Sequence, residues 1–265
     1  MENMLSKEQL LSKVPEVTLV FWMIKIAATT LGETGGDMVS MTFNLGYLAS
    51  TFIFLAFFLV AVSFQVRSRV FHPVLYWTVI VATTTAGTTL ADFADRSLGI
   101  GYTGGSLLLL ALLVATLAFW RYREGRISVD HIVSPRVEAF YWATIFTSNT
   151  LGTALGDWLA DETPLGYDGG ALVFGGLLVL VATAARWTRM SKALLFWVAF
   201  ILTRPLGATL GDFLTKAHAD GGLELSRIQT SLIIAGFVVL CVALIPQRAG
   251  RHPGHVESIA ELESE

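Results

Sequence analysis

Residues 22–37, WMIKIAATTLGETGGD, hold the pattern that decides the fold. The same spacing returns in residues 77–92 (WTVIVATTTAGTTLAD), 142–157 (WATIFTSNTLGTALGD) and 197–212 (WVAFILTRPLGATLGD). With the tryptophan as position 0, every copy has a glycine at +10, a glycine or alanine at +14, and an aspartate at +15. Recurrence at fixed positions without gaps is the signature of an internal repeat. The chain is therefore built from four copies of one unit.

The recurring residues form three groups. The tryptophans are Trp22, Trp77, Trp142 and Trp197. The small residues are Gly32, Gly36, Gly87, Ala91, Gly152, Gly156, Gly207 and Gly211. The aspartates are Asp37, Asp92, Asp157 and Asp212. The interval between tryptophans is the same within the first pair as within the second, and longer between the pairs, which indicates two duplicated halves.

Composition places the repeats in a membrane. Apolar residues make up 54% of the 265 residues and charged residues 15%, whereas soluble domains are about 25% charged. Each motif is followed by an apolar stretch, at 48–64, 106–120, 171–185 and 231–245. The sequence therefore predicts an all-α integral membrane protein with eight transmembrane helices, from four parallel two-helix repeats. Because polar helices are costly in lipid, we expect the motif helices inside and the apolar helices outside.

The basic residues between the repeats predict how the chain is oriented in the membrane. The expected segments are an N-terminal cytoplasmic segment (1–16), four repeats (17–66, 72–120, 137–186 and 193–246), a cytoplasmic linker (121–136) and a disordered cytoplasmic tail (247–265). Arginine and lysine gather between repeats, which by the positive-inside rule places both termini in the cytoplasm. A two-helix unit returns to its starting side, so all four aspartates should lie at one depth, roughly 22 Å along the helix from the tryptophan.

The small residues and tryptophans have an expected structural role. Glycines four positions apart let two helix backbones approach closely in a membrane. We expect these glycines to pack the motif helices together, and their faces also offer a surface for a homo-oligomer. The tryptophans should mark the cytoplasmic interface of the bilayer, as aromatic belts do.

The carboxylates carry the functional prediction. On a helical wheel the tryptophan, +8, +11 and the aspartate fall within about 80° of one another, so each motif helix has one polar face. A charged aspartate at the centre of a membrane helix costs about 3 kcal/mol, so the unpaired acids need protons, metal ions or water. The candidate ion- or substrate-binding residues are Glu33, Asp37, Asp92, Asp157, Asp212, Asn44, Thr88, Thr153, Lys25 and Arg204. The first five are the candidate metal ligands. Lys25 or Arg204 should pair with an acid, and the sequence leaves open which.

Ligand chemistry limits the cargo. Oxygen donors dominate the polar faces, which suits a proton, Na⁺, Mg²⁺, Ca²⁺ or Mn²⁺ and does not suit Cu⁺. An organic cation stays open, because aromatic rings lie near the helix ends. No organic cofactor is expected. The chain lacks a basic block, so nucleic acid is not an expected partner, whereas the lipid bilayer is.

The Trp–x9–Gly–x4–Asp motif at 22–37, 77–92, 142–157 and 197–212 resembles a family of bacterial membrane proteins with four tandem repeats of unknown function. The resemblance covers about residues 17–245 and implies the two-span repeat, a bacterial inner-membrane location and no mechanism. Repeat 4 departs most, with Pro205 and Ala208 where threonine stands in repeats 2 and 3, and no tyrosine after Gly221.

Three functions remain open from the sequence. The first is a transporter or channel for a hard cation, because acidic rings and duplicated halves suit conduction and alternating access. The second is an ion-binding scaffold or sensor that conducts nothing. The third, which we do not favour, is an intramembrane enzyme: Glu33 and Asp37 could act in acid–base chemistry, but the chain has no metalloprotease helix motif and no phosphate-binding loop.

Overall fold

The computed structural model describes residues 13–68, 70–125, 127 and 135–249. Within these ranges the chain forms eight long α-helices and, apart from one isolated bridge between Pro15 and Ala249, no β-structure. The helices are α2 (Leu19–Asp37), α3 (Gly46–Arg67), α4 (Pro73–Asp92), α5 (Gly101–Glu124), α6 (Pro135–Asp161), α7 (Gly166–Trp187), α8 (Lys192–Thr215) and α9 (Arg227–Leu244). Two π-helical turns, η1 (Met38–Thr42) and η2 (Phe93–Ser97), follow α2 and α4, and a short 3-10 turn, η3 (His218–Asp220), follows α8. The predicted all-α fold with two helices per repeat is confirmed.

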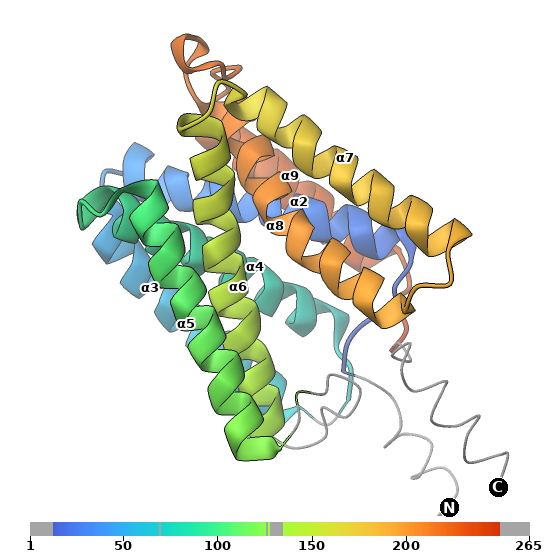
Figure 1. The fold of residues 1–265 in the computed structure, drawn as a ribbon. Helices are drawn as coiled ribbons and strands as arrows, with labels where there is room; N and C mark the ends of the chain where they lie inside the picture. Colours follow the sequence, from blue (N-terminus) through green and yellow to red (C-terminus); the bar gives the residue numbers. More distant parts are fainter. Residues whose placement is uncertain (1–12, 69, 126, 128–134, 250–265) are drawn as a thin grey trace, which may run out of the picture.

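The four motif helices form a closed ring. α2 packs against α4, α4 against α6, α6 against α8, and α8 packs against α2 again. Each second helix packs most extensively on the motif helix of the next repeat: α3 on α4, α5 on α6, α7 on α8 and α9 on α2. Figure 1 shows α5 running beside α6, and α7 beside α8. The contact of α9 with α2 joins the last repeat to the first and completes the ring.

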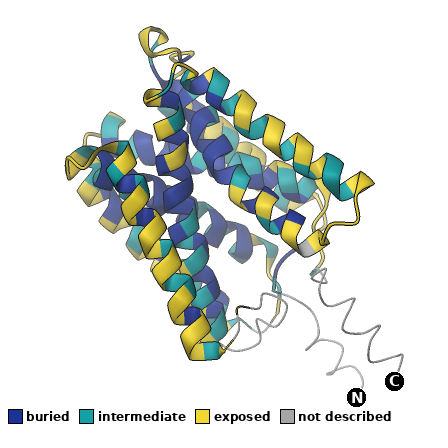
Figure 2. Cartoon of the chain, in the orientation of Figure 1, coloured by how far each residue is buried: buried dark blue, intermediate teal, exposed yellow. Residues whose placement is uncertain are grey.

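Burial separates the inner helices from the outer ones. In α4 and α8, 72% and 67% of the most apolar stretch is buried, whereas in α3, α5, α7 and α9 the share lies between 6% and 22%. In Figure 2 the outward faces of α5 and α7 are largely exposed, and the helices behind them are buried. These outer helices present rows of leucine, valine and phenylalanine, the surface that hydrocarbon accepts.

Six of the described helices are long and apolar enough to cross a membrane: α3, α4, α5, α7, α8 and α9. α2 and α6 are long enough but more polar. α2, for example, carries Lys25, Glu33 and Asp37. Both occupy the same ring as α4 and α8 and are covered by outer helices. The protein is therefore a helical membrane protein with its polar motif helices at the centre.

Glycines at +10 set the spacing of the ring. In three of the four contacts, position +10 of one repeat lies against position +7 of the next: Gly32 meets Thr84, Gly152 meets Arg204, and Gly207 meets Thr29. In the fourth, Gly87 lies closest to Thr150 at position +8. A methyl group on Gly32 would lie 2.5 Å from Thr84 Oγ1, so only glycine allows this approach. The glycine faces are used between helices of one chain, so a homo-oligomer would need another surface.

Aromatic rings close one end of the ring. Each tryptophan contacts the aromatic residue at position −1 of the preceding repeat, and the four centroid distances lie between 5.5 and 6.2 Å. The pairs are Phe21–Trp77, Tyr76–Trp142, Tyr141–Trp197 and Phe196–Trp22. Trp77 and Trp142 are only 2% exposed. Each tryptophan therefore packs on a neighbouring motif helix; Trp77 and Trp142 are buried, whereas Trp22 and Trp197 stay partly exposed.

The helices α5 and α6 extend into the segment that the sequence predicted as a cytoplasmic linker. α5 continues to Glu124, four residues into the predicted linker 121–136, and α6 begins at Pro135. In the N-terminal segment, Lys13 forms an ion pair of 2.8 Å with Glu138 on α6, and Val14 is buried. Residues 1–12 and most of the predicted tail lie outside the described residues.

Candidate cation site

The ring brings the four aspartates to one level. Asp37, Asp92, Asp157 and Asp212 stand near the carboxyl ends of α2, α4, α6 and α8, and each is 1% exposed. They meet because four equivalent helices run in the same sense and each carries the aspartate at the same distance from its aromatic layer. Parallel repeats therefore turn one sequence position into a ring of side chains.

Glu33 is the fifth carboxylate and lies among the other four. Glu33 forms one group with Asp37 and Asp92 and a second group with Asp157 and Asp212. In each group, one carboxylate oxygen from each of the three residues lies within 4.8 Å of the other two. Oxygens on opposite sides of a cation are about 4.2–4.8 Å apart when each bond is about 2.1–2.4 Å. Either group is therefore compact enough to contact a single ion, and Glu33 belongs to both.

Arg204 occupies the centre of the ring beside Glu33. Its Nη2 lies within hydrogen-bond distance of three acceptors, Glu33 Oε2 at 3.1 Å, Thr88 Oγ1 at 2.5 Å and Thr153 Oγ1, which share its two N–H groups. These three acceptors are the +11 residues of repeats 1, 2 and 3, while repeat 4 has the small Ala208 at that position. The partner of Arg204, which the sequence left open, is thus Glu33.

Two further cations cover the other side of the aspartates. Arg96 Nε lies 3.2 Å from Asp92, and its Nη2 lies 3.7 Å from Asp157 and 3.8 Å from Asp161. Lys216 Nζ lies 3.2 Å from Asp212 and 3.4 Å from Asp37. Both occupy position +19, in repeats 2 and 4, and each bridges the aspartate of its own repeat to that of the next.

Sequence reasoning missed Arg96 and Lys216 as part of the site. Neither residue was among the predicted ion- or substrate-binding residues. In the structure η2 carries the helical path on to Ser97, and Lys216 directly follows α8. The available signal was spacing: each basic residue stands four positions after its aspartate, where two side chains share a helix face.

Several carboxylate oxygens lack partners. Among the described residues, Asp37 Oδ1, Asp92 Oδ2 and Asp157 Oδ1 are buried with neither a hydrogen bond nor an ion-pair contact. The negative charge of Asp157 is the least well compensated of the four aspartates. Its ion-pair partner among the described residues is Arg96 at 3.7 Å, which is farther than the nearest cation of the other three aspartates. Buried polar groups are nearly always paired in proteins, so these oxygens point to a missing cation or proton.

Charge counting gives the same result. With Asp161, the cluster holds six carboxylates, and the cations within ion-pair distance are Arg96, Arg204, Lys216 and Arg227, the last 3.6 Å from Asp37. Six minus four leaves two negative charges without a protein counter-ion in the described chain. A monovalent or divalent cation, or protons, would supply the balance.

Two predicted ligands lie away from the carboxylates. Asn44 is exposed in the turn after η1 with a positive φ of 55°, because the π-helical turn ends the helix before that position can share the polar face. Lys25 is fully buried, yet its Nζ lies 4.1 Å from the centre of the Phe200 ring and contacts no acid. Thr88 donates to Glu33 Oε2 at 3.2 Å, and both Thr88 and Thr153 accept from Arg204.

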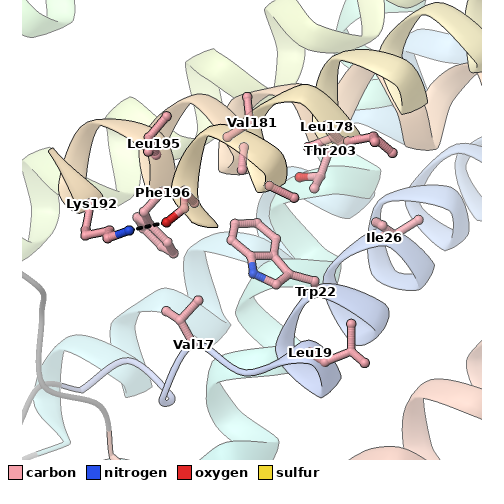
Figure 3. A pocket seen from close by; sticks show the side chains of 14 residues that line it. Val17, Leu19, Trp22, Ile26, Leu178, Val181, Lys192, Leu195, Phe196 and Thr203 are labelled. Carbon is pink, nitrogen blue, oxygen red and sulfur yellow. Dashed lines mark hydrogen bonds between the residues drawn. The ribbon is translucent and has the colours of Figure 1, made fainter. Parts of the chain in front are cut away.

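An apolar groove on the outer surface is a different feature. It has a volume of about 530 Å³ and lies between α2, α7 and α8. Figure 3 shows Trp22 and Ile26 lining it with Leu178 and Val181, and Lys192 near one end donating to the carbonyl of Ala185. No acid lines it, so it is not the cation site.

Fold and site together define a multi-pass helical membrane protein made of four tandem two-helix repeats around a buried acidic centre. The chain belongs to the family described as Repeat of Unknown Function (DUF347), whose model matches residues 20–71, 75–126, 140–191 and 195–246. Neither a curated protein nor a solved structure matches the chain. The family supports the repeat architecture and supplies no activity.

Proposed function

We propose that this protein is a membrane carrier for a hard cation, which binds at the Glu33-centred carboxylate cluster. The observation that carries the proposal is the set of buried oxygens of Asp157, Asp37 and Asp92 that have no partner and lie around one glutamate. Oxygen-only ligands favour Na⁺, Mg²⁺, Ca²⁺, Mn²⁺ or a proton over soft metals. Acids inside a membrane protein are expensive to maintain and commonly mark ion pathways.

A carrier fits the arrangement better than an open pore. Every carboxylate of the cluster other than Asp161 is at most 2% exposed, Arg204 occupies the axis beside them, and the aromatic layer closes one end. A cation bound here would be enclosed on both sides, as in the occluded state of alternating access. The duplicated halves supply the two bodies that such a cycle moves.

We propose a bacterial inner-membrane location with both termini in the cytoplasm. The support is the clustering of arginine and lysine between repeats. Under this orientation the aromatic layer faces the cytoplasm and the aspartates lie toward the outside. A reporter fused after residue 265 that is active only in the cytoplasm tests the orientation.

The first experiment is thermal unfolding of purified protein against a panel of cations at fixed anion and ionic strength. A ligand that binds only the folded state raises the melting temperature with its concentration. We expect one hard cation to stabilise wild type, and Asp157→Asn to abolish that shift. Asp168→Asn, an exposed aspartate of α7 outside the cluster, is the matched control and should keep it. No shift with any cation contradicts the proposal.

The second candidate is an ion-binding scaffold that moves nothing. The contacts of Arg204 Nη2 with residues of three other repeats favour it. These contacts hold the four motif helices together and so resist a change in their packing. Flux in liposomes with the stabilising cation separates the two: a carrier transports it and loses transport in Asp157→Asn, whereas a scaffold binds it without flux.

A further inference from the structure

Two buried cations on neighbouring helices form a separate feature next to the carboxylates. Lys25 lies at position +3 of α2 and is 0% exposed, and Arg204 lies at position +7 of α8 and is 1% exposed. α2 and α8 pack directly against each other. Lys25 Nζ lies 4.1 Å from the centre of the Phe200 ring, and Phe200 stands one helical turn before Arg204 on α8. The cation-binding proposal uses only one end of Arg204 and does not use Lys25.

The unused donors of the two side chains are numerous. Lys25 Nζ has no hydrogen-bond partner among the described residues, and neither do Nε and Nη1 of Arg204. An ammonium group carries three donors, and these two guanidinium nitrogens carry three more. Only Nη2 of Arg204 is engaged, with Glu33, Thr88 and Thr153. Burying charged donors without acceptors is strongly unfavourable, so an acceptor is missing on this side.

The surrounding protein groups do not replace that acceptor. The single O–H of Thr29 lies within hydrogen-bond distance of the carbonyls of Lys25, Ile26 and Thr203, and Thr203 Oγ1 donates to that of Phe200. The Phe200 ring beneath Lys25 offers a cation–π contact, which offsets part of the burial cost. No carboxylate lies within ion-pair distance of Lys25 in the described chain. Water would satisfy donors but would leave the repulsion between two neighbouring positive charges.

We propose that a small inorganic anion, such as chloride, binds between the ammonium group of Lys25 and the Nη1 group of Arg204. An anion accepts from both cations at once and cancels their repulsion. A small ion is required because both side chains are fully enclosed and the apolar groove of Figure 3 is lined by their chain neighbours Ile26 and Thr203, not by Lys25 or Arg204 themselves. Arg204 then stands between an anion on one side and Glu33 on the other. This site does not depend on cation transport being correct.

The test is the melting temperature of the full-length protein as chloride replaces gluconate at constant cation and ionic strength. We expect wild type to gain stability with chloride concentration until saturation, and bromide to act similarly. Gluconate is too large for the enclosed site and should have no effect. Equal melting temperatures in all three anions overturn the proposal and leave water, or an uncharged Lys25, as the explanation.

Lys25→Met supplies the residue test. The substitution removes the ammonium and keeps the chain length, so we expect the chloride effect to vanish and stability in gluconate to equal or exceed that of wild type. Lys192→Met, which alters an exposed lysine, should keep the full chloride effect. A chloride effect that survives in Lys25→Met contradicts the assignment. Loss of cation stabilisation in Asp157→Asn is scored in gluconate, so the two proposals fail separately.

Discussion

At the scale of single residues, function rests on where the repeats differ. Position +11 is glutamate in repeat 1, threonine in repeats 2 and 3, and alanine in repeat 4. Position +7 is threonine, threonine, asparagine and arginine. Arg204 thus pairs with Glu33 on the adjacent helix α2, and the small Ala208 leaves space for the guanidinium. Because removing one partner of a buried ion pair strongly destabilises a protein, we expect this pair to specify which repeats become neighbours.

Lys216→Met should strengthen cation binding. Lys216 neutralises Asp212 at 3.2 Å and Asp37 at 3.4 Å, and its removal leaves one more negative charge for the cation to satisfy. We expect the affinity for the stabilising cation to rise by about tenfold, equivalent to about 1.4 kcal/mol, and the ion-free protein to be less stable. Cation titration of the melting temperature measures both. Unchanged or weaker affinity, with Lys192→Met as control, would show that Lys216 does not compete with the ion.

At the scale of helices, much of the arrangement followed from the sequence. The glycines at +10 and +14 predicted close packing of the motif helices, and the structure confirms it at Gly32, Gly152 and Gly207. The neighbour of each glycine could not be predicted. The repeated motif shows which face of a helix carries small residues, but it does not show which other helix packs against that face. The cyclic order, with α9 covering α2, needed the three-dimensional fold.

The candidate site was predicted less completely than the helices. The five acids stood out because they recur or lie on the same face, and the structure brings them together. Arg96 and Lys216 were not among the predicted ligands, although each stands four positions after its aspartate. The sequence also did not predict the π-helical turn Phe93–Ser97, which carries Arg96. Lys25 was expected near an acid because of its depth, but its helix face turns it toward Phe200.

Two glycines of α2 provide a matched test of the close packing. A Cβ on Gly32 would lie 2.5 Å from Thr84 Oγ1 and 3.0 Å from the Thr84 carbonyl carbon, whereas a Cβ on Gly35 meets nothing within 4 Å. Gly32→Ala should therefore separate α2 from α4 and cost about 1–3 kcal/mol. Gly35→Ala should be neutral or stabilising by up to about 1 kcal/mol, from helix propensity. Unfolding in detergent measures the difference, and equal effects would refute the packing argument.

At the scale of the whole molecule, the two halves are interlocked. α2 and α4 of the first half contact α8 and α6 of the second, α5 covers α6, and α9 covers α2. Neither half can bury its polar motif helices alone, because two sides of the ring belong to the other half. The halves also carry opposite members of the central pair, Glu33 in the first and Arg204 in the second.

The protein should therefore assemble from two separate chains, 1–127 and 128–265, expressed together. Helices that form independently in a membrane associate through their packing surfaces, and the cut lies between α5 and α6. We expect the pair to copurify and to show the cation-dependent stabilisation of the intact chain. Copurification tests assembly, and the melting temperature tests the site.

Each half alone is the decisive control. A dimer of first halves would place two copies of Glu33 in the ring without Arg204, and a dimer of second halves would place two copies of Arg204 there without Glu33. Like charges buried together are strongly unfavourable, so neither half should form a stable ring with itself. The double substitution Glu33→Gln and Arg204→Gln removes this discrimination, and self-association of the halves should then increase. If wild-type halves self-associate as well as they pair, the central ion pair does not specify the order of the repeats.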